Sequence, residues 1–156
     1  MMTEIGNKAP SFTLERDGET KISLKDLHGQ WVVVYFYPKD ATPGCTKQAI
    51  AFTEHADEFA KLDTVIVGIS PDSVRSHDKF IQKYGLNIIL ASDEKRSAIE
   101  SYEVWKEKKM YGRSYMGVER STFLVDRRGI IQAVWRKVKV PGHVDEVLTA
   151  VRKLQE

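Results

Sequence analysis

The chain holds very little cysteine: Cys45 is the single thiol among 156 residues. One cysteine cannot close a disulfide within its own chain, which excludes the disulfide-stapled class of small secreted scaffold. A disulfide reductase with a Cys-x-x-Cys pair is excluded as well, because Gln48 takes the second position. The question is then whether Cys45 is a small apolar core residue or a nucleophile.

Long apolar runs and an excess of charge are also missing. No run approaches the ~18 residues that a membrane helix needs, and residues 1–6 have neither the basic start nor the apolar core of a signal peptide. Lys and Arg number 24 against 22 Asp and Glu, so nothing indicates a polyanionic partner. The basic cluster of Lys106, Lys108, Lys109 and Arg113 is interpreted as a solvated face. We expect a cytoplasmic protein with no membrane partner and no nucleic-acid partner.

What is present is the composition of a globular domain. Hydrophobic residues make up 42% of the chain and charged residues 29%, and both fractions are ordinary for a folded soluble protein. The length suits one domain of about 100–200 residues. Because no repeat, low-complexity tract or linker divides the sequence, we expect a single domain over residues 1–156.

Strand and helix patterns alternate along the chain. Residues 31–37 and 64–70 are apolar throughout and rich in β-branched residues, which is typical of strands buried on both faces of a sheet. A hairpin is expected over 12–24, and further strands over 87–90, 121–126 and 130–135. Helices are expected over 43–62, 73–84, 92–104 and 144–154, with residues 105–120 irregular. The pattern predicts an α/β sandwich on a mixed sheet.

The residues before Cys45 favour a reactive thiol. In Thr42-Pro43-Gly44-Cys45, threonine suits the N-cap of a helix and proline its first position. Cys45 would then lie in the first turn, where free N–H groups and the helix dipole stabilise a thiolate. Gly44 would leave the backbone beside the sulfur bare, so that a small substrate can approach. The site also follows a buried strand, where open α/β sheets bind ligands.

Other cysteine chemistries lack their partners. A cysteine-phosphatase loop would need arginine where Ala51 stands. A protease would need a histidine base, but each histidine occupies a polar sequence context that we interpret as exposed and without a partner. These histidines are His28, His55, His77 and His143. A zinc site is not expected, because ligand residues are not clustered. A thiolate open to a small electrophile remains.

The segment Tyr37–Thr46, with the sequence YPKDATPGCT, resembles the active-site loop of the Q-type peroxiredoxins, also called bacterioferritin comigratory proteins. The similarity covers almost the whole chain. It continues in residues 6–12, 111–117, 120–126, 135 and 142–143. The resemblance implies a thioredoxin-like fold, in which helices flank a central mixed β-sheet that begins with an N-terminal hairpin. It also implies a thiol-dependent peroxidase that uses neither a cofactor nor a metal.

The resemblance assigns a role to each residue of the loop. Cys45 would be the peroxidatic thiolate that attacks the O–O bond and becomes a sulfenic acid. Thr42 would hydrogen-bond the peroxide beside Gly44, and Pro38 would shield the thiolate from water. Arg120 would stabilise the thiolate and the charge on the leaving oxygen, which is preorganised electrostatic catalysis. The structural alternatives are a strand terminator for Pro38, a simple cap for Thr42 and a surface ion pair for Arg120.

Two positions depart from the family pattern. Many members carry a resolving cysteine where this chain has Ile50, and often a glutamate where it has Gln48. With one thiol, the Cys45 sulfenate must be reduced by an external thiol such as thioredoxin, glutaredoxin or a low-molecular-weight thiol. The resemblance implies hydrogen peroxide and organic hydroperoxides as substrates and a monomeric state.

Two other functions fit the same sequence. A peroxide sensor or relay would use the same Cys45 chemistry but pass its oxidation to a partner protein. A holdase on a thioredoxin-like scaffold would not need the thiol, since fold does not fix function. Replacing Cys45 with serine separates the holdase, which should be indifferent to the change.

Overall fold

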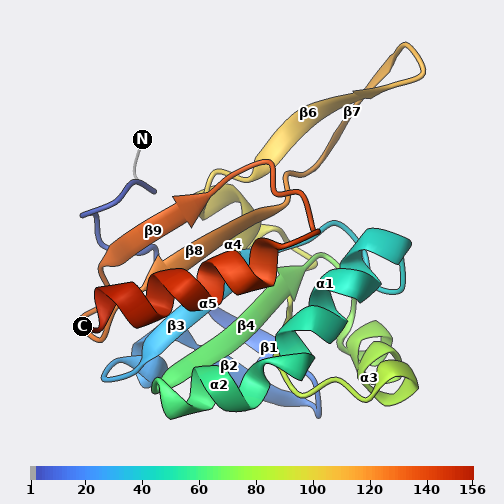
Figure 1. The fold of residues 1–156 in the computed structure, drawn as a ribbon. Helices are drawn as coiled ribbons and strands as arrows, with labels where there is room; N and C mark the ends of the chain where they lie inside the picture. The colour runs from blue at the N-terminus through green and yellow to red at the C-terminus, as the bar shows by residue number, and fades with distance from the viewer. Residues whose placement is uncertain (1–2) are drawn as a thin grey trace.

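A seven-stranded mixed sheet forms the centre of the computed structural model, which describes residues 3–156 (Figure 1). Met1 and Met2 lie outside the described residues. They belong to residues 1–6, for which the sequence does not predict a signal peptide. The strand order is β2-β1-β5-β4-β3-β8-β9. The strands are β1 (Thr13–Arg16), β2 (Thr20–Ser23), β3 (Trp31–Phe36), β4 (Thr64–Ser70), β5 (Ile89–Ser92), β8 (Ser121–Val125) and β9 (Ile131–Trp135).

The central strand β3 is buried along its whole length, as its apolar sequence predicts. It pairs in parallel with β4 and antiparallel with β8. Because successive side chains point to opposite faces, Val33 and Tyr35 pack in one hydrophobic layer while Val34 and Phe36 pack in the other. β3 ends at the loop that leads to Cys45.

Helices cover both faces of this sheet. On one face lie α1 (Pro43–Glu54), α2 (Ala56–Lys61), α3 (Val74–Tyr84) and α5 (His143–Leu154). The short 3-10 helix η1 (Leu24–Leu27), α4 (Ser97–Ser101) and the N-terminal segment close the other face. No helix within residues 3–156 has the length and apolar character needed to cross a membrane.

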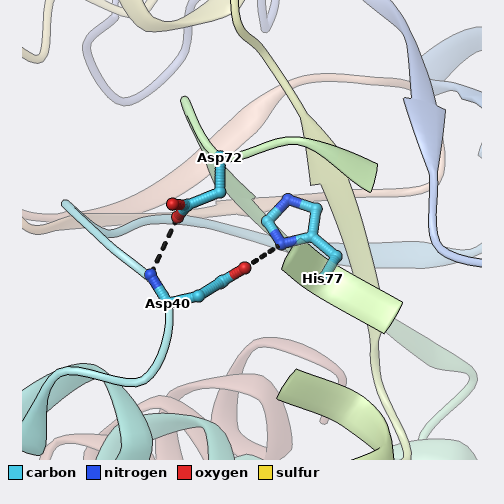
Figure 2. Close-up of side chains that lie close together, drawn as sticks. All are labelled: Asp40, Asp72 and His77. Carbon is cyan, nitrogen blue, oxygen red and sulfur yellow. Dashed lines mark hydrogen bonds and ion pairs between the residues drawn. The ribbon is translucent and has the colours of Figure 1, made fainter. Parts of the chain in front are cut away.

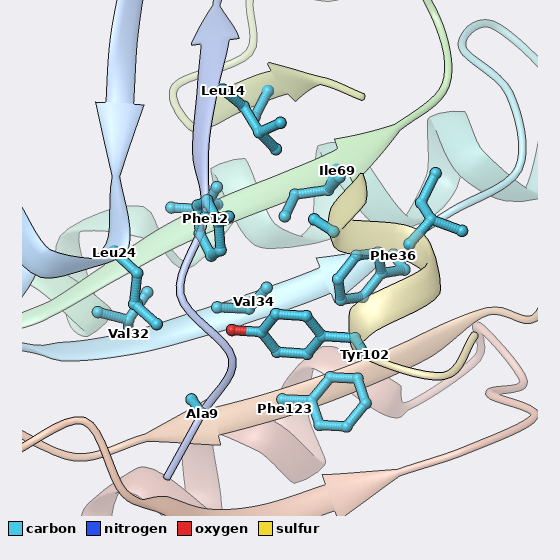
Figure 3. Close-up of a cluster of buried hydrophobic side chains, with 14 of the residues drawn as sticks. Ala9, Phe12, Leu14, Leu24, Val32, Val34, Phe36, Ile69, Tyr102 and Phe123 are labelled. Carbon is cyan, nitrogen blue, oxygen red and sulfur yellow. The ribbon is translucent and has the colours of Figure 1, made fainter. Parts of the chain in front are cut away.

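An aromatic cluster joins the N-terminal segment to β8 (Figure 3). The ring centroid of Tyr102 lies 5.2 Å from that of Phe123 and 5.0 Å from that of Phe36. The Tyr102 hydroxyl donates a hydrogen bond of 2.7 Å to the carbonyl of Pro10. Aromatic contacts of this kind add to the area term of burial, and they hold β8 rigidly beside β3.

The structure corrects three of the predicted elements. The helix expected over 43–62 breaks at His55 into α1 and α2, and the helix expected over 92–104 shortens to α4. Residues 105–120 are not irregular: β6 (Trp105–Met110) and β7 (Arg113–Val118) form a two-stranded hairpin that projects from the sheet (Figure 1). Its loop residues Tyr111 and Gly112 both have positive φ, as a two-residue hairpin turn requires.

Candidate active site

The thiol lies in the first turn of α1, where the sequence predicts it. Thr42 is the N-cap, with extended backbone angles, and Pro43 is the first helical residue. Within residues 3–156 the backbone N–H groups of Gly44 and Cys45 have no acceptor, as expected at a helix start. Cys45 is only 2% exposed and belongs to the hydrophobic layer beneath α1. The thiol therefore lies in a nearly dry site at a helix start whose first N–H groups are unpaired.

Arg120 reaches this sulfur from the other end of the sequence. Antiparallel pairing sets Ser121 opposite Phe36, so the residue before β8 falls beside the loop that follows β3. The Arg120 Nη2 donates to the Cys45 Sγ at 3.3 Å, and Nη1 donates to Oε1 of the buried Gln48 at 2.6 Å. Arg120 has no ion-pair partner among the described residues, so the alternative of a surface ion pair is wrong.

Gly44 makes room for the arginine. A Cβ atom at this position would lie 3.3 Å from the Arg120 Nη2, which is tighter than an ordinary contact. The space beside Gly44, expected to be bare, therefore holds the guanidinium group. Glycine at this position allows the close approach of Arg120 to the helix start.

Thr42 and Pro38 flank the site. The Thr42 hydroxyl donates to the carbonyl of Lys39 at 2.8 Å and caps no N–H group, so its predicted capping role rests on the backbone alone. Pro38 is half-buried and lines, together with Arg120, a surface pocket of about 370 Å³. The structure thus brings the five predicted residues to one end of α1.

Tyrosine rings form the floor of the site. Tyr35 stacks on Phe52 at 4.7 Å and on Tyr37 at 5.5 Å between ring centroids. Burial raises the pKa of Tyr35 well above its ordinary value, and the nearby charges of Cys45 and Asp40 raise it further. The phenol is therefore neutral, and its buried hydroxyl has no partner in the described protein.

Behind this floor, the active-site loop is tied to α3 and to the segment that follows β4 (Figure 2). The Asp40 carboxylate accepts hydrogen bonds from the Tyr37 hydroxyl at 2.6 Å and from Ser76 at 2.8 Å. Its backbone N–H donates to Asp72 at 2.8 Å. His77 Nδ1 lies 2.7 Å from the same carboxylate, and both side chains are buried.

His77 has a partner at each ring nitrogen. Its Nε2 lies 3.0 Å from the carbonyl of Ala91, which can only accept a hydrogen bond, so this nitrogen is a donor. Its Nδ1 lies 2.7 Å from the Asp40 carboxylate and 3.4 Å from the Tyr37 hydroxyl. These buried contacts fix the loop between β3 and α1 to α3.

The same cluster corrects the expectation that metal ligands are scattered. Asp40, Asp72 and His77 place one ligand atom each within 4.8 Å of one another. Protein donors already contact these atoms, with the Ser70 hydroxyl on Asp72 at 2.7 Å. We therefore interpret the cluster as a structural hydrogen-bond network.

The expectation of exposed, unpartnered histidines is wrong for three of the four. His77 pairs as described, and His55 Nδ1 lies 2.8 Å from Glu58. His143 is buried, with Nε2 2.8 Å from the Thr122 hydroxyl. Burial, together with the positive charge of Arg120, lowers the pKa of His143 to about 4. His143 is therefore neutral at pH 7.

A comparison with known protein families identifies the family of the chain. Residues 5–134 match the model described as the AhpC/TSA family. The chain belongs to the AhpC/TSA family. Peroxiredoxin Bcp of Bacillus subtilis is 47% identical over 156 residues, covering 100% of this chain and 99% of the relative. A relative from Coxiella burnetii, named putative peroxiredoxin bcp, is 50% identical over 95% of this chain and 98% of its own.

Solved structures of this AhpC/TSA group share the fold. A PrxQ cysteine-to-serine mutant from Xylella fastidiosa superposes with a TM-score of 0.95 at 38% identity, covering 100% of this chain and 99% of the other. A bacterioferritin comigratory protein from Xanthomonas campestris, described for its alkyl peroxide reduction activity, gives 0.89 at 43% identity over 93% and 92%. The predicted thioredoxin-like peroxiredoxin fold, with its mixed sheet and N-terminal hairpin, is confirmed.

The roles of several site residues were not predicted from the sequence. Gln48 stood out only as a departure from the family, and no signal marked it as the partner of Arg120. The pairing of Asp40 with His77 joins residues 37 positions apart. Lys108 lay in a segment expected to be irregular, yet it approaches Arg120, whose charge contributes to the lowering of the Lys108 pKa after burial itself.

Proposed function

We propose that the protein is a thiol-dependent peroxidase that reduces hydrogen peroxide and organic hydroperoxides through a sulfenic acid on Cys45. The observation that carries this proposal is the 3.3 Å contact of Arg120 Nη2 with the sulfur at the unpaired start of α1. The names of the relatives and the alkyl peroxide reduction described for the Xanthomonas campestris protein support it.

The chemistry follows from where charge moves. The Cys45 thiolate attacks one peroxide oxygen, the S–O bond forms as the O–O bond breaks, and the leaving oxygen takes a proton to become water or an alcohol. The Arg120 guanidinium and the free N–H groups of Gly44 and Cys45 are fixed donors for the negative charge. The Thr42 hydroxyl, by turning from the Lys39 carbonyl, would orient the peroxide, while Pro38 limits access of water.

The return of Cys45 to the thiol is proposed to use an external reductant. Because Cys45 is the one cysteine of the chain, an intramolecular disulfide cannot form. At 2% exposure it is poorly placed to meet a second Cys45. We propose a monomeric, cytoplasmic, one-domain enzyme whose sulfenate is reduced by thioredoxin, glutaredoxin or a small thiol.

Stopped-flow tryptophan fluorescence tests the peroxidatic step. We expect Cys45 to react with hydrogen peroxide orders of magnitude faster than free cysteine thiolate. Cys45→Ser should abolish the signal, and Arg120→Gln should slow the reaction about 10²-fold, the typical cost of one oxyanion donor. A rate like that of free cysteine, or a signal that survives in Cys45→Ser, would refute the proposal. Quantitative conversion to a disulfide dimer would refute the one-cysteine cycle.

A further inference from the structure

A basic pocket is lined in part by Arg120. It has a volume of about 370 Å³ and lies between the loop after β3, the β6–β7 hairpin and the segment after β9. Three lysines line it together with Arg120, namely Lys106, Lys108 and Lys137. Lys106 and Lys108 are two residues apart on β6, so they share one face of that strand.

The positive charge of this pocket is only partly neutralised by the protein. Within residues 3–156 no carboxylate lies within ion-pair distance of Lys106, Lys108 or Lys137. Glu119 also lines the pocket but is engaged by Arg136 at 3.8 Å and by the Ser121 hydroxyl. Glu107, the other acidic residue of the lining, is exposed on β6. The lining thus holds four cationic side chains, the three lysines and Arg120, against two carboxylates. One of these carboxylates, that of Glu119, also pairs with Arg136.

Lys108 shows the effect of this imbalance. The pKa of Lys108 is lowered, first by partial burial and then by the positive charge of Arg120. An anion in the pocket would relieve this repulsion and compensate the desolvation of the lysine. Because Lys106 and Lys108 are half-buried, their attraction for an anion exceeds that of fully exposed lysines.

The geometry connects the pocket to the thiol through one side chain. Arg120 lines the pocket and also donates to the Cys45 sulfur at 3.3 Å. At 2% exposure, Cys45 leaves little room for the cysteine of a folded partner. A small, flexible molecule held in the pocket is separated from the sulfur by the Arg120 side chain alone.

We propose that this pocket binds a small thiol bearing a carboxylate, and that this anionic thiol reduces the Cys45 sulfenic acid. The proposal rests on the peroxidase function above and names its reductant class. The thiol sulfur attacks Cys45, forming an S–S bond as the S–OH bond breaks and water leaves. A second thiol molecule then displaces Cys45, so two thiols give one disulfide and restore the cysteine.

The test separates oxidation from reduction. The protein is first oxidised with one equivalent of hydrogen peroxide, and the rate of that step is recorded without any thiol. The oxidised protein is then mixed with 3-mercaptopropionate, 2-mercaptoethanol or cysteamine, which are anionic, neutral and cationic. Each reduction rate is divided by the thiolate fraction of its reagent. We expect the anionic thiol to react about tenfold faster or more than the neutral one, with an advantage that shrinks as salt screens it.

Charge-reversal variants locate the preference. In Lys106→Glu/Lys108→Glu the ratio of anionic to neutral rates should fall about tenfold or more, and cysteamine should become the preferred reagent. Lys153→Gln, on the exposed end of α5, is the matched control and should keep the wild-type ratio. Equal rates for the three thiols, or a ratio that persists in the double variant, would overturn the inference. Slow oxidation in the first step would instead overturn the peroxidase function itself.

Discussion

Asp40 is part of the active-site loop, but its side chain is buried and makes its contacts in the protein interior. Its carboxylate accepts hydrogen bonds from Tyr37 and Ser76 and lies 2.7 Å from His77 Nδ1, and its N–H donates to Asp72. A buried hydrogen-bond network is costly to break, because removing one partner leaves a buried polar group unsatisfied. The network therefore fixes the backbone between β3 and α1, on which the position of Cys45 depends.

Replacement of Asp40 with asparagine should destabilise the protein. One amide oxygen would replace two carboxylate oxygens in a buried site, so the hydrogen bonds with Tyr37, Ser76 and His77 cannot all be kept. We expect the free energy of unfolding to fall by about 1–3 kcal/mol. Urea unfolding at pH 7 measures the change. The double variant Asp40→Asn/His77→Gln, which pairs two amides, should recover part of the loss. A single variant as stable as the wild type would contradict a stabilising role for this network.

At this scale, local sequence predicts part of the site. The position of Cys45 and the backbone role of Thr42 follow from the Thr-Pro-Gly-Cys order, because capping depends on neighbours in the chain. The approach of Arg120 to Cys45 depends on strand pairing, which local sequence does not reveal. Arg120 was predicted as a site residue from the family resemblance. The roles of Gln48 and His77 were not predictable from the sequence, since contacts across 72 and 37 positions create them.

At the scale of the elements, the packing of β4 beside β3 depends on a glycine. Gly68 lies opposite Tyr35 in the parallel register. A Cβ at Gly68 would lie 2.7 Å from the Tyr35 Cζ and 2.9 Å from a methyl carbon of Leu90. The Tyr35 ring cannot retreat, because Phe52 and Tyr37 stack against it. The strand therefore needs glycine at this position to accommodate the aromatic floor of the site.

Gly68→Ala should cost stability through overpacking. Forcing extra atoms into a filled core typically destabilises by about 1–3 kcal/mol, and the sub-3 Å approach sets this case at the upper end. Gly117→Ala is the matched control, because its new methyl would meet the flexible Lys108 stem at 3.3 Å. Thermal unfolding of both variants measures the effect. Equal stability of the two variants would show that the Tyr35 stack adapts.

Element prediction succeeded where burial and periodicity coincide. The strands β3, β4, β8 and β9 follow from apolar, β-branched runs. The hairpin of β6 and β7 was missed because its polar, exposed residues carry no apolar alternation. The break at His55 was missed because apolar spacing continues across it. Local pattern thus identifies the core elements, whereas exposed elements need turn geometry, here the Tyr111-Gly112 turn.

At the scale of the whole molecule, one buried imidazole contributes to the pH dependence of stability. His143 begins α5 beneath Arg120 and Trp135, and its pKa is lowered to about 4 in the folded protein. The ordinary histidine pKa in an unfolded chain is about 6.5. Between these two values the unfolded state binds a proton that the folded state does not. The free energy of unfolding therefore falls as the pH falls through this window.

Urea unfolding at pH 7 and pH 5 tests this linkage. The wild type should lose about 1–2 kcal/mol more than His143→Gln over this interval, because one group protonates only in the unfolded chain. Glutamine does not titrate and can still face the Thr122 hydroxyl. Identical pH dependence in the two proteins would contradict a depressed His143 pKa.

The projecting hairpin has a consequence for how separate molecules meet. β6 and β7 pair only with each other in the described chain, so each strand presents one open edge. Open edges invite strand addition from another chain, and natural sheets resist it with charged residues, lysine above all. Lys106, Lys108, Lys109 and Arg113 supply such charges along these strands. Neutralising them together would expose an edge flanked by Tyr111 and Met116, and would make the hairpin a seed for aggregation.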